Sequence, residues 1–167
     1  MLHELGAVEL RLRRVDEATG RYERALALYT EVGEEHGRAL VLSGLSLLDR
    51  LRGETDRAQV RLREILPVFR AVGDRSSEAY TLQSLGQCAL DQGRPEAALE
   101  LCRESLRVCE IIGVNRRSLA QARHRLGTAH LALGQLETAE IEFIRALEIA
   151  RDRSDLLGVA YTLLGLA

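Results

Sequence analysis

The sequence predicts an all-α fold, a solenoid in which antiparallel helix hairpins stack into a right-handed superhelix. Three observations favour it. A short pattern of Leu, a small residue and a downstream Ala recurs four times at a nearly constant interval. Glycines fall at regular positions between the repeats and within them. Ala, Leu, Glu and Arg dominate a chain with only two Pro and no Trp, a mixture that favours helix.

The recurring pattern has a fixed internal spacing and a period of about 40 residues. In each copy the Ala follows the small residue by twelve positions. The copies are Leu5-Gly6 with Ala18, Leu45-Ser46 with Ala58, Leu85-Gly86 with Ala98, and Leu126-Gly127 with Ala139. A further step of 40 reaches Leu166-Ala167, so a fifth copy begins there. A constant period in this range is the signature of a repeat architecture.

A column of larger side chains follows each Ala by four residues and consists of Tyr22, Leu62, Cys102 and Phe143. The small residues of a unit let its two helices approach closely, and the larger side chain fills the space that they leave. Neither helix can bury its apolar face alone, so stacking of successive hairpins is expected to create one continuous core.

Glycines mark the expected turns. Gly33, Gly73 and Gly113 close three units, where a left-handed helix end favours glycine, and Ser154 closes the fourth. The middle of the units holds Gly53, Gly93 and Gly134, with Arg13 in the first. Each unit is therefore predicted to be two helices joined by a tight turn. We expect one domain over residues 1–167, with units at about 1–33, 34–73, 74–113 and 114–154, and a partial fifth at 155–167. This arrangement would contain nine helices and no strand.

These columns resemble the tetratricopeptide repeat in a long form of about 40 residues, over essentially the whole chain. The segments Tyr22-Glu23-Arg24-Ala25-Leu26 and Val72-Gly73-Asp74-Arg75 look like the repeat half of SARP-type bacterial transcription regulators. They are similar also to the long repeats of kinesin light chain and of Pins-type spindle-orientation scaffolds. The resemblance implies a protein–protein interaction module, in a regulator whose DNA-binding domain would lie outside this segment.

Composition narrows the possible functions. All 23 basic residues are Arg, which excludes a Schiff-base or P-loop lysine and suggests a GC-rich bacterial genome. The net charge is −2, so this segment is not expected to bind nucleic acid. No apolar run approaches the roughly 20 residues of a membrane span, and the N-terminus lacks the order of a signal peptide. We therefore expect a cytoplasmic protein without membrane contact.

Catalytic and metal-binding patterns are absent from the sequence. The four histidines His3, His36, His124 and His130 form no pair with i, i+4 spacing, and no cysteine lies at a ligand-like interval from them. Cys88, Cys102 and Cys109 are interpreted as small buried apolar residues. We predict that the protein is not an enzyme and that it has no cofactor, metal or catalytic residue.

The concave surface of the solenoid is the predicted binding site for a protein or peptide segment. It would be lined by the first helix of each hairpin. The expected residues, called the predicted strip below, are Leu40, Ser43, Leu47, Tyr80, Gln83, Gln87, Gln121, His124 and Thr128. Glutamine amides can hold an extended peptide backbone, and a tyrosine offers a large rigid contact. Two alternatives stay open at this point. A tight pocket around Tyr80, Gln83 and His124 would indicate a peptide or small-molecule receptor, and a featureless strip would indicate a structural self-assembly element.

Two further features bear on partners. Between Glu110 and Glu137 there is no acidic residue, while Arg116, Arg117, Arg123 and Arg125 form a basic patch that suits an acidic partner or a phosphate. The favoured interpretation is that these guanidinium groups pair with carboxylates of neighbouring helices, such as Glu96, Glu100 and Glu104. The Leu-rich stretch 155–167 lacks the polar cap that a solenoid end needs. It therefore suggests either a longer protein or a homodimer through this uncapped C-terminal helix.

Overall fold

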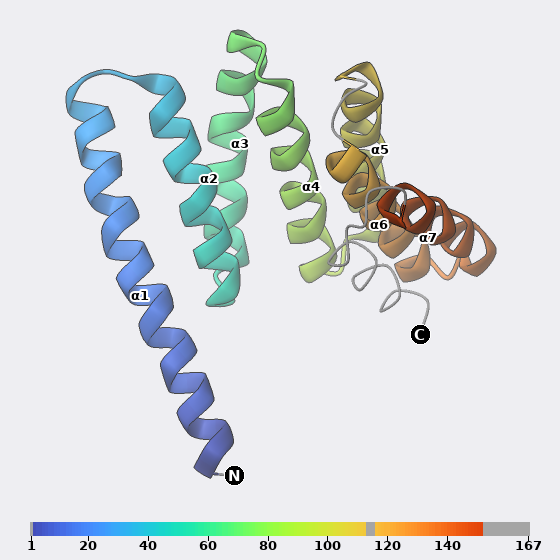
Figure 1. The fold of residues 1–167 in the computed structure, drawn as a ribbon, viewed down its shortest axis with the longest axis horizontal. Helices are drawn as coiled ribbons and strands as arrows, with labels where there is room; N and C mark the ends of the chain where they lie inside the picture. The colour runs from blue at the N-terminus through green and yellow to red at the C-terminus, as the bar shows by residue number, and fades with distance from the viewer. Residues whose placement is uncertain (1, 113–115, 152–167) are drawn as a thin grey trace. The chain divides into compact units, whose positions relative to one another are not determined.

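The computed structural model describes residues 2–112 and 116–151, with side chains over 14–111 and 116–150. Seven α-helices and no strand make up these ranges, as Figure 1 shows. The helices are α1 (Leu2–Glu31), α2 (Glu35–Leu51), α3 (Thr55–Val72), α4 (Arg75–Asp91), α5 (Pro95–Ile112), α6 (Arg116–Ala132) and α7 (Leu136–Arg151). The prediction of an all-α solenoid is confirmed. The chain divides into two compact units, Met1–Val72 with α1 to α3 and Gly73–Ala167 with α4 to α7.

The predicted glycine turns are present. Gly33, Gly53, Gly73, Gly93 and Gly134 all have φ between 68° and 81°, in the left-handed region that side chains with a Cβ avoid. At Gly53 the amide donates to the carbonyl of Arg50, and the next amide donates to the carbonyl of Asp49, which satisfies the end of α2. Gly113 lies outside the described residues.

The prediction of a helix hairpin in the first unit is wrong. Residues 2–31 form one uninterrupted helix of 30 residues, with no turn at Arg13. The later units have a glycine at the equivalent position, and the first unit has an arginine that continues a helix without strain. In Figure 1 the N-terminal part of α1 extends beyond the ends of α2 and α3. The ninth predicted helix, at 155–167, lies outside the described residues.

In the first unit, two tyrosines of α1 pack on two glycines of α2. A Cβ added to Gly44 would lie 2.5 Å from Cε1 of Tyr22, and a Cβ added to Gly37 would meet the ring of Tyr29. Both pairs are spaced by seven residues, which returns each helix to the same face after about two turns. The repeat pattern predicted that Tyr22 would fill the space between the two helices of the first hairpin. In the structure its ring instead packs against Gly44 of α2.

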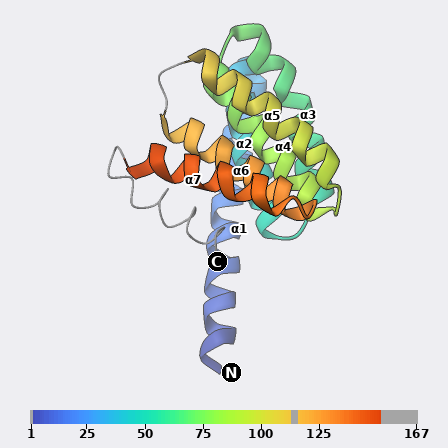
Figure 2. The same cartoon turned by 90° about the vertical axis from the view of Figure 1, so that its right-hand side faces the viewer.

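In the second unit, the expected fit of large against small residues is confirmed. A Cβ on Gly86 would approach Sγ of Cys102 to 2.9 Å, and one on Gly127 would approach the ring of Phe143 to 2.7 Å. The helices therefore meet closely at α4–α5 and at α6–α7, and Figure 2 shows α6 and α7 side by side. One cluster links α5 and α6 with α4 and is built from Ala89, Ala98, Leu99, Cys102, Leu126 and Ala129.

Candidate functional site

The part of the predicted strip in the first unit lies on α2. Leu42, Leu45 and Leu48 are buried on one side of this helix. Leu40 and Leu47 are exposed on the other side, seven residues apart. Ser43 is half-buried between the two faces. Leu51, which the sequence interpretation left out, is also exposed and continues the same stripe, because it follows Leu47 by four residues.

On α4, Tyr80 is available and Gln83 is not. Tyr80 is 42% exposed, so its ring can meet a partner. Gln83 is only 5% exposed, and placing it on the surface strip is therefore wrong. Its amide Nε2 donates to Ser105 Oγ of α5 at 3.2 Å and to the Ser118 carbonyl of α6 at 3.5 Å. The Ser105 hydroxyl in turn donates to the Ala79 carbonyl at 3.0 Å, so Gln83 belongs to a buried polar network that joins three helices.

The signal that distinguishes Gln83 from Gln87 is its position relative to the buried stripe. Gln83 follows buried Ala79 by four residues and precedes buried Gly86 by three, so it continues the buried stripe of α4, whereas Gln87 follows exposed Tyr80 by seven residues. Gln87 is half-buried and donates to Asp91 Oδ1 at 2.9 Å, while its Oε1 accepts from Arg125 of α6. The hydrogen bond from Arg125 to the Gln87 amide therefore links α4 to α6, and the bond from Gln87 to Asp91 lies within α4.

On α6, the three predicted residues differ in exposure. Gln121 is exposed, whereas His124 and Thr128 are half-buried. The Thr128 hydroxyl donates to the carbonyl of His124 at 3.0 Å. The His124 ring packs on Phe143 of α7 with 5.3 Å between centroids, and its buried Nδ1 has no hydrogen-bond partner. Burial lowers the pKa of His124 to about 4, and the charge of Arg125 contributes to the same shift, so this imidazole is neutral near pH 7.

The basic patch is divided between half-buried arginines that contact neighbouring helices and exposed arginines. Arg123 joins three helices, because its Nη1 lies 2.8 Å from Glu142 Oε2 of α7 and its Nη2 lies 3.6 Å from Glu110 Oε1 of α5. Arg125 contacts the neutral amide of Gln87. Pairing with neighbouring helices was the expectation, but the carboxylates that Arg123 uses are not the Glu96, Glu100 and Glu104 suggested for it. Arg116 and Arg117 lie exposed at the start of α6.

A buried ion pair in the first unit was not predicted. Asp49 of α2 is only 2% exposed, and its Oδ2 lies 2.9 Å from Nη1 of Arg61 on α3. Burial raises the pKa of the Asp49 carboxyl, and the charges of Arg61 and Arg57 oppose that shift. A sequence signal did exist, because position 49 continues the buried stripe of Leu42 and Leu45 at i+7 and i+4. A carboxylate at such a position needs a basic partner.

The described residues contain no cluster of three or more His, Cys, Asp or Glu side chains that could hold a metal ion. Cys88, Cys102 and Cys109 are free thiols, and all three are buried. None of the described helices combines the length and the apolar character that a membrane span requires.

The amino-acid sequence was compared with models of known protein families. A model described as tetratricopeptide repeat matches residues 1–71 and 77–152. Among curated proteins, none matches the chain.

Several solved structures share the fold. BtubC (BKLC) from P. vanneervenii aligns with a TM-score of 0.75 and 22% identity, over 90% of this chain and 62% of that one. The chain therefore spans less than two thirds of BtubC. A Podosopora anserina putative kinesin light chain with nearly identical TPR-like repeats aligns with a TM-score of 0.65 and 18% identity, over 90% and 74% of the two chains. The N-terminal domain of stress-induced protein-1 (STI-1) from C. elegans aligns with a TM-score of 0.59 and 15% identity, over 77% and 97%. At these identities the likeness concerns the fold alone.

Proposed function

The chain belongs to the tetratricopeptide-repeat family, whose repeats form protein–protein interaction scaffolds, and we propose that it is the partner-binding segment of a cytoplasmic bacterial transcription regulator. Its partner is a protein or peptide segment, and the binding faces are those of the first helices of the hairpins. The resemblance to SARP-type regulators supports the regulatory role. A chain rich in arginine without lysine supports a bacterial source with a GC-rich genome.

The observation that carries the binding role is the exposure of apolar side chains on these first helices. Leu40 and Leu47 of α2 and Tyr80 of α4 are 46%, 43% and 42% exposed. The fold already has a buried face on each helix, so it gains nothing from apolar groups on the opposite side. Exposed apolar and aromatic groups of this kind supply the anchor contacts of interfaces.

A receptor with a pocket around Tyr80, Gln83 and His124 has less support. The Gln83 amide is engaged by Ser105 and Ser118, and the His124 ring packs on Phe143. A ligand could recruit either group only by breaking the contacts that hold α4 to α5 and α6 to α7.

The test is capture of a partner from a GC-rich bacterial lysate, identification of that partner by mass spectrometry, and a binding isotherm with the purified partner. The test variant is Tyr80→Ala with Gln121→Ala, which changes two exposed groups and leaves the Gln83 network intact. Val60→Ala is the control, because Val60 is exposed on α3, a second helix of a hairpin. Binding should weaken at least about tenfold in the test variant and stay unchanged in the control. If the wild type, the test variant and the control bound the partner with equal affinity, the exposed side chains of α4 and α6 would not form the binding face.

The regulatory part needs a separate measurement. The full-length polypeptide should bind promoter DNA in a fluorescence-polarisation assay, and addition of the purified partner should change that affinity. A full-length polypeptide without DNA affinity would contradict the regulator role and leave the scaffold role standing.

A further inference from the structure

The outer face of α7 carries two isoleucines that the repeat architecture does not require. Ile141 and Ile144 are 48% and 42% exposed. They lie on the side of α7 away from Ala139, Phe143 and Ala146, which are buried. The two isoleucines are three residues apart and therefore share one face of the helix.

The equivalent helix of the preceding hairpin, α5, shows that the positions of Ile141 and Ile144 do not need apolar side chains for packing. Ala98 of α5 corresponds to Ala139 of α7, so Glu100 corresponds to Ile141 and Arg103 corresponds to Ile144. Glu100 and Arg103 are both exposed, and α5 nevertheless buries Ala98 and Cys102 completely. A helix at this place in the repeat thus packs well with charged residues where α7 has isoleucine.

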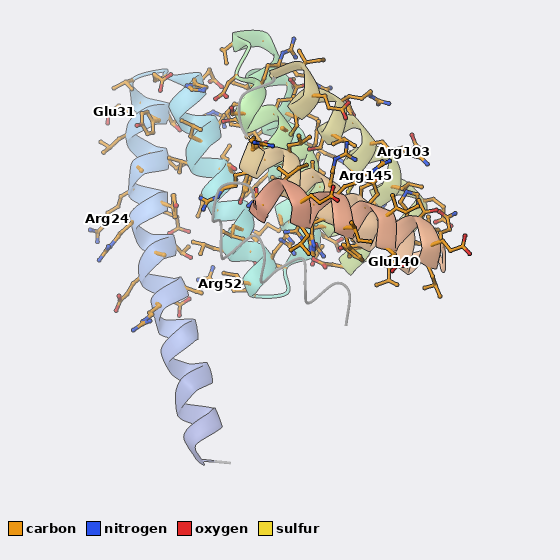
Figure 3. All side chains as sticks on the ribbon, turned by 45° about the vertical axis from the view of Figure 1, so that its right-hand side comes forward. Arg24, Glu31, Arg52, Arg103, Glu140 and Arg145 are labelled. Carbon is orange, nitrogen blue, oxygen red and sulfur yellow. The ribbon has the colours of Figure 1, made fainter. Side chains whose placement is uncertain are left out.

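Three exposed glutamates lie around the two isoleucines, and the exposed basic side chain next to them, Arg145, pairs with Glu142 of the same helix at 3.1 Å. Glu137 precedes Ile141 by four residues, and Glu148 follows Ile144 by four, so all four groups lie along one stripe. Glu140 is exposed at the border of this stripe, and Figure 3 labels it on α7. This set of Glu137, Glu140, Ile141, Ile144 and Glu148 is called the α7 outer face below.

A second exposed surface of this unit carries mainly basic groups. It is made by α4 and α6, which contact each other, and it contains Tyr80, Arg116, Arg117 and Gln121. The whole of α6 has no acidic residue. This set of four exposed side chains, called the α4–α6 face below, combines an aromatic ring with two guanidinium groups.

We propose that the α7 outer face of one copy of this chain docks on the α4–α6 face of a second copy. Ile141 and Ile144 would cover the ring of Tyr80, and the glutamates would lie beside Arg116 and Arg117. The charges are complementary, which favours this pairing and disfavours contact between two like faces.

The two faces belong to one compact unit but point in different directions. The ring of Phe143 lies against Gly127, so this side of α6 is turned towards α7, whereas Gln121 projects from an exposed side of α6. One copy therefore cannot bring its own α7 outer face onto its own α4–α6 face. The contact must therefore form between two copies. It can give a closed two-fold dimer with two such contacts, or an open head-to-tail assembly. This inference does not depend on the transcriptional role.

The first test measures self-association of the purified chain by sedimentation velocity over a range of concentrations. The wild type should associate at roughly 50 mM NaCl and less at roughly 500 mM NaCl, because exposed charge pairs are screened by salt. Ile141→Glu with Ile144→Arg installs the residues that α5 already carries, so folding is preserved and association should weaken at least about tenfold. The control is Val60→Glu, a change of a 67% exposed side chain on α3, and it should associate as the wild type does.

A charge-exchange experiment distinguishes this pairing from any other self-contact. Glu137→Arg with Glu148→Arg should abolish association, and so should Arg116→Glu with Arg117→Glu. Mixing the two variants should restore it, because each then offers a face of the sign that the other needs. A monomeric wild type, unchanged association of the isoleucine variant, or a mixture that stays monomeric would each overturn the proposal. Thermal melts by circular dichroism confirm that every variant is folded.

Discussion

The ring of Tyr22 on α1 lies directly over Gly44 on α2, so close that a methyl group on Gly44 would come within 2.5 Å of Cε1 and 2.6 Å of Cζ. Tyr29 and Gly37 repeat the contact two turns away. These contacts, together with the ion pair of Arg52 with Asp16, hold the long helix α1 against α2 within the first unit; Figure 3 labels Arg52. The absence of side chains at the two glycines is what allows the approach.

Gly44→Ala should therefore destabilise the protein by about 1–2 kcal/mol, since the methyl group displaces the Tyr22 ring. The matched control is Gly20→Ala, because Gly20 also lies inside a helix but has no neighbour within 4 Å of an added Cβ. That control should stabilise by about 0.5–1 kcal/mol through helix propensity. Urea unfolding measures both. A stabilising Gly44→Ala would contradict the close packing seen here.

The ion pair between Asp49 and Arg61 gives a second prediction, from comparison with the next repeat. The equivalent positions there hold Ala89 and Leu101. Asp49→Ala alone or Arg61→Leu alone leaves one charge without its buried partner and should lower the free energy of unfolding by about 3 kcal/mol. The double variant should lose less than about 1 kcal/mol, because an apolar pair already fills this site one repeat later.

A double-mutant cycle by chemical unfolding checks this expectation. The control pair is Arg103 with Glu100, an exposed i, i+3 pair on α5 at 3.2 Å. Its removal should change stability by less than about 0.5 kcal/mol. Additive losses in the Asp49 cycle would show that the buried pair contributes no coupling.

His124 should make stability depend on pH. The unfolded chain takes up a proton on this histidine below about pH 6.5, whereas the folded ring stays neutral down to about pH 4. The unfolded state thus binds more protons in this window, and stability falls as the pH falls from 6.5 to 4. Because the ring is partly exposed, the expected loss is about 1–2 kcal/mol.

The comparison for this prediction is His124→Gln, the residue that the preceding repeat has at Gln83. Carboxylates also titrate near pH 4, so the informative quantity is the difference between the two unfolding free energies from pH 7 to pH 4.5. The wild type should lose more than the variant. Parallel pH profiles would contradict a neutral buried imidazole.

The thiols should be unreactive in the folded protein. Burial raises the pKa of Cys102 to about 12 and also raises that of Cys109. Cys88, Cys102 and Cys109 are all buried, so an aromatic disulfide reagent should label none of them within minutes at pH 8. Unfolding in guanidinium should release about three equivalents, which serves as the internal control. Rapid labelling of the native protein would indicate that α5 opens readily.

Much of the repeat structure could be predicted because it rests on local spacing. The positions of the glycine turns and the pairing of Gly86 with Cys102 and Gly127 with Phe143 follow from residue type and period. The continuous α1 did not follow, although Arg13 in place of a turn glycine was a visible sign of it. At the candidate site, Leu40, Leu47 and Tyr80 of the predicted strip are exposed, whereas Gln83 is buried.

Sequence by itself determined the fold class, the turns at Gly53, Gly73, Gly93 and Gly134, and the family, because a 40-residue period and glycine turns are properties of a single chain segment and its nearest neighbours. Tertiary structure alone decided which polar side chains lie inside the protein. Gln83, Arg123 and Asp49 have the residue types of surface groups, yet each is buried or half-buried next to a partner on another helix. These pairs depend on how the helices pack in three dimensions. The periodicity of a single helix does not predict which side chain of another helix will lie next to it.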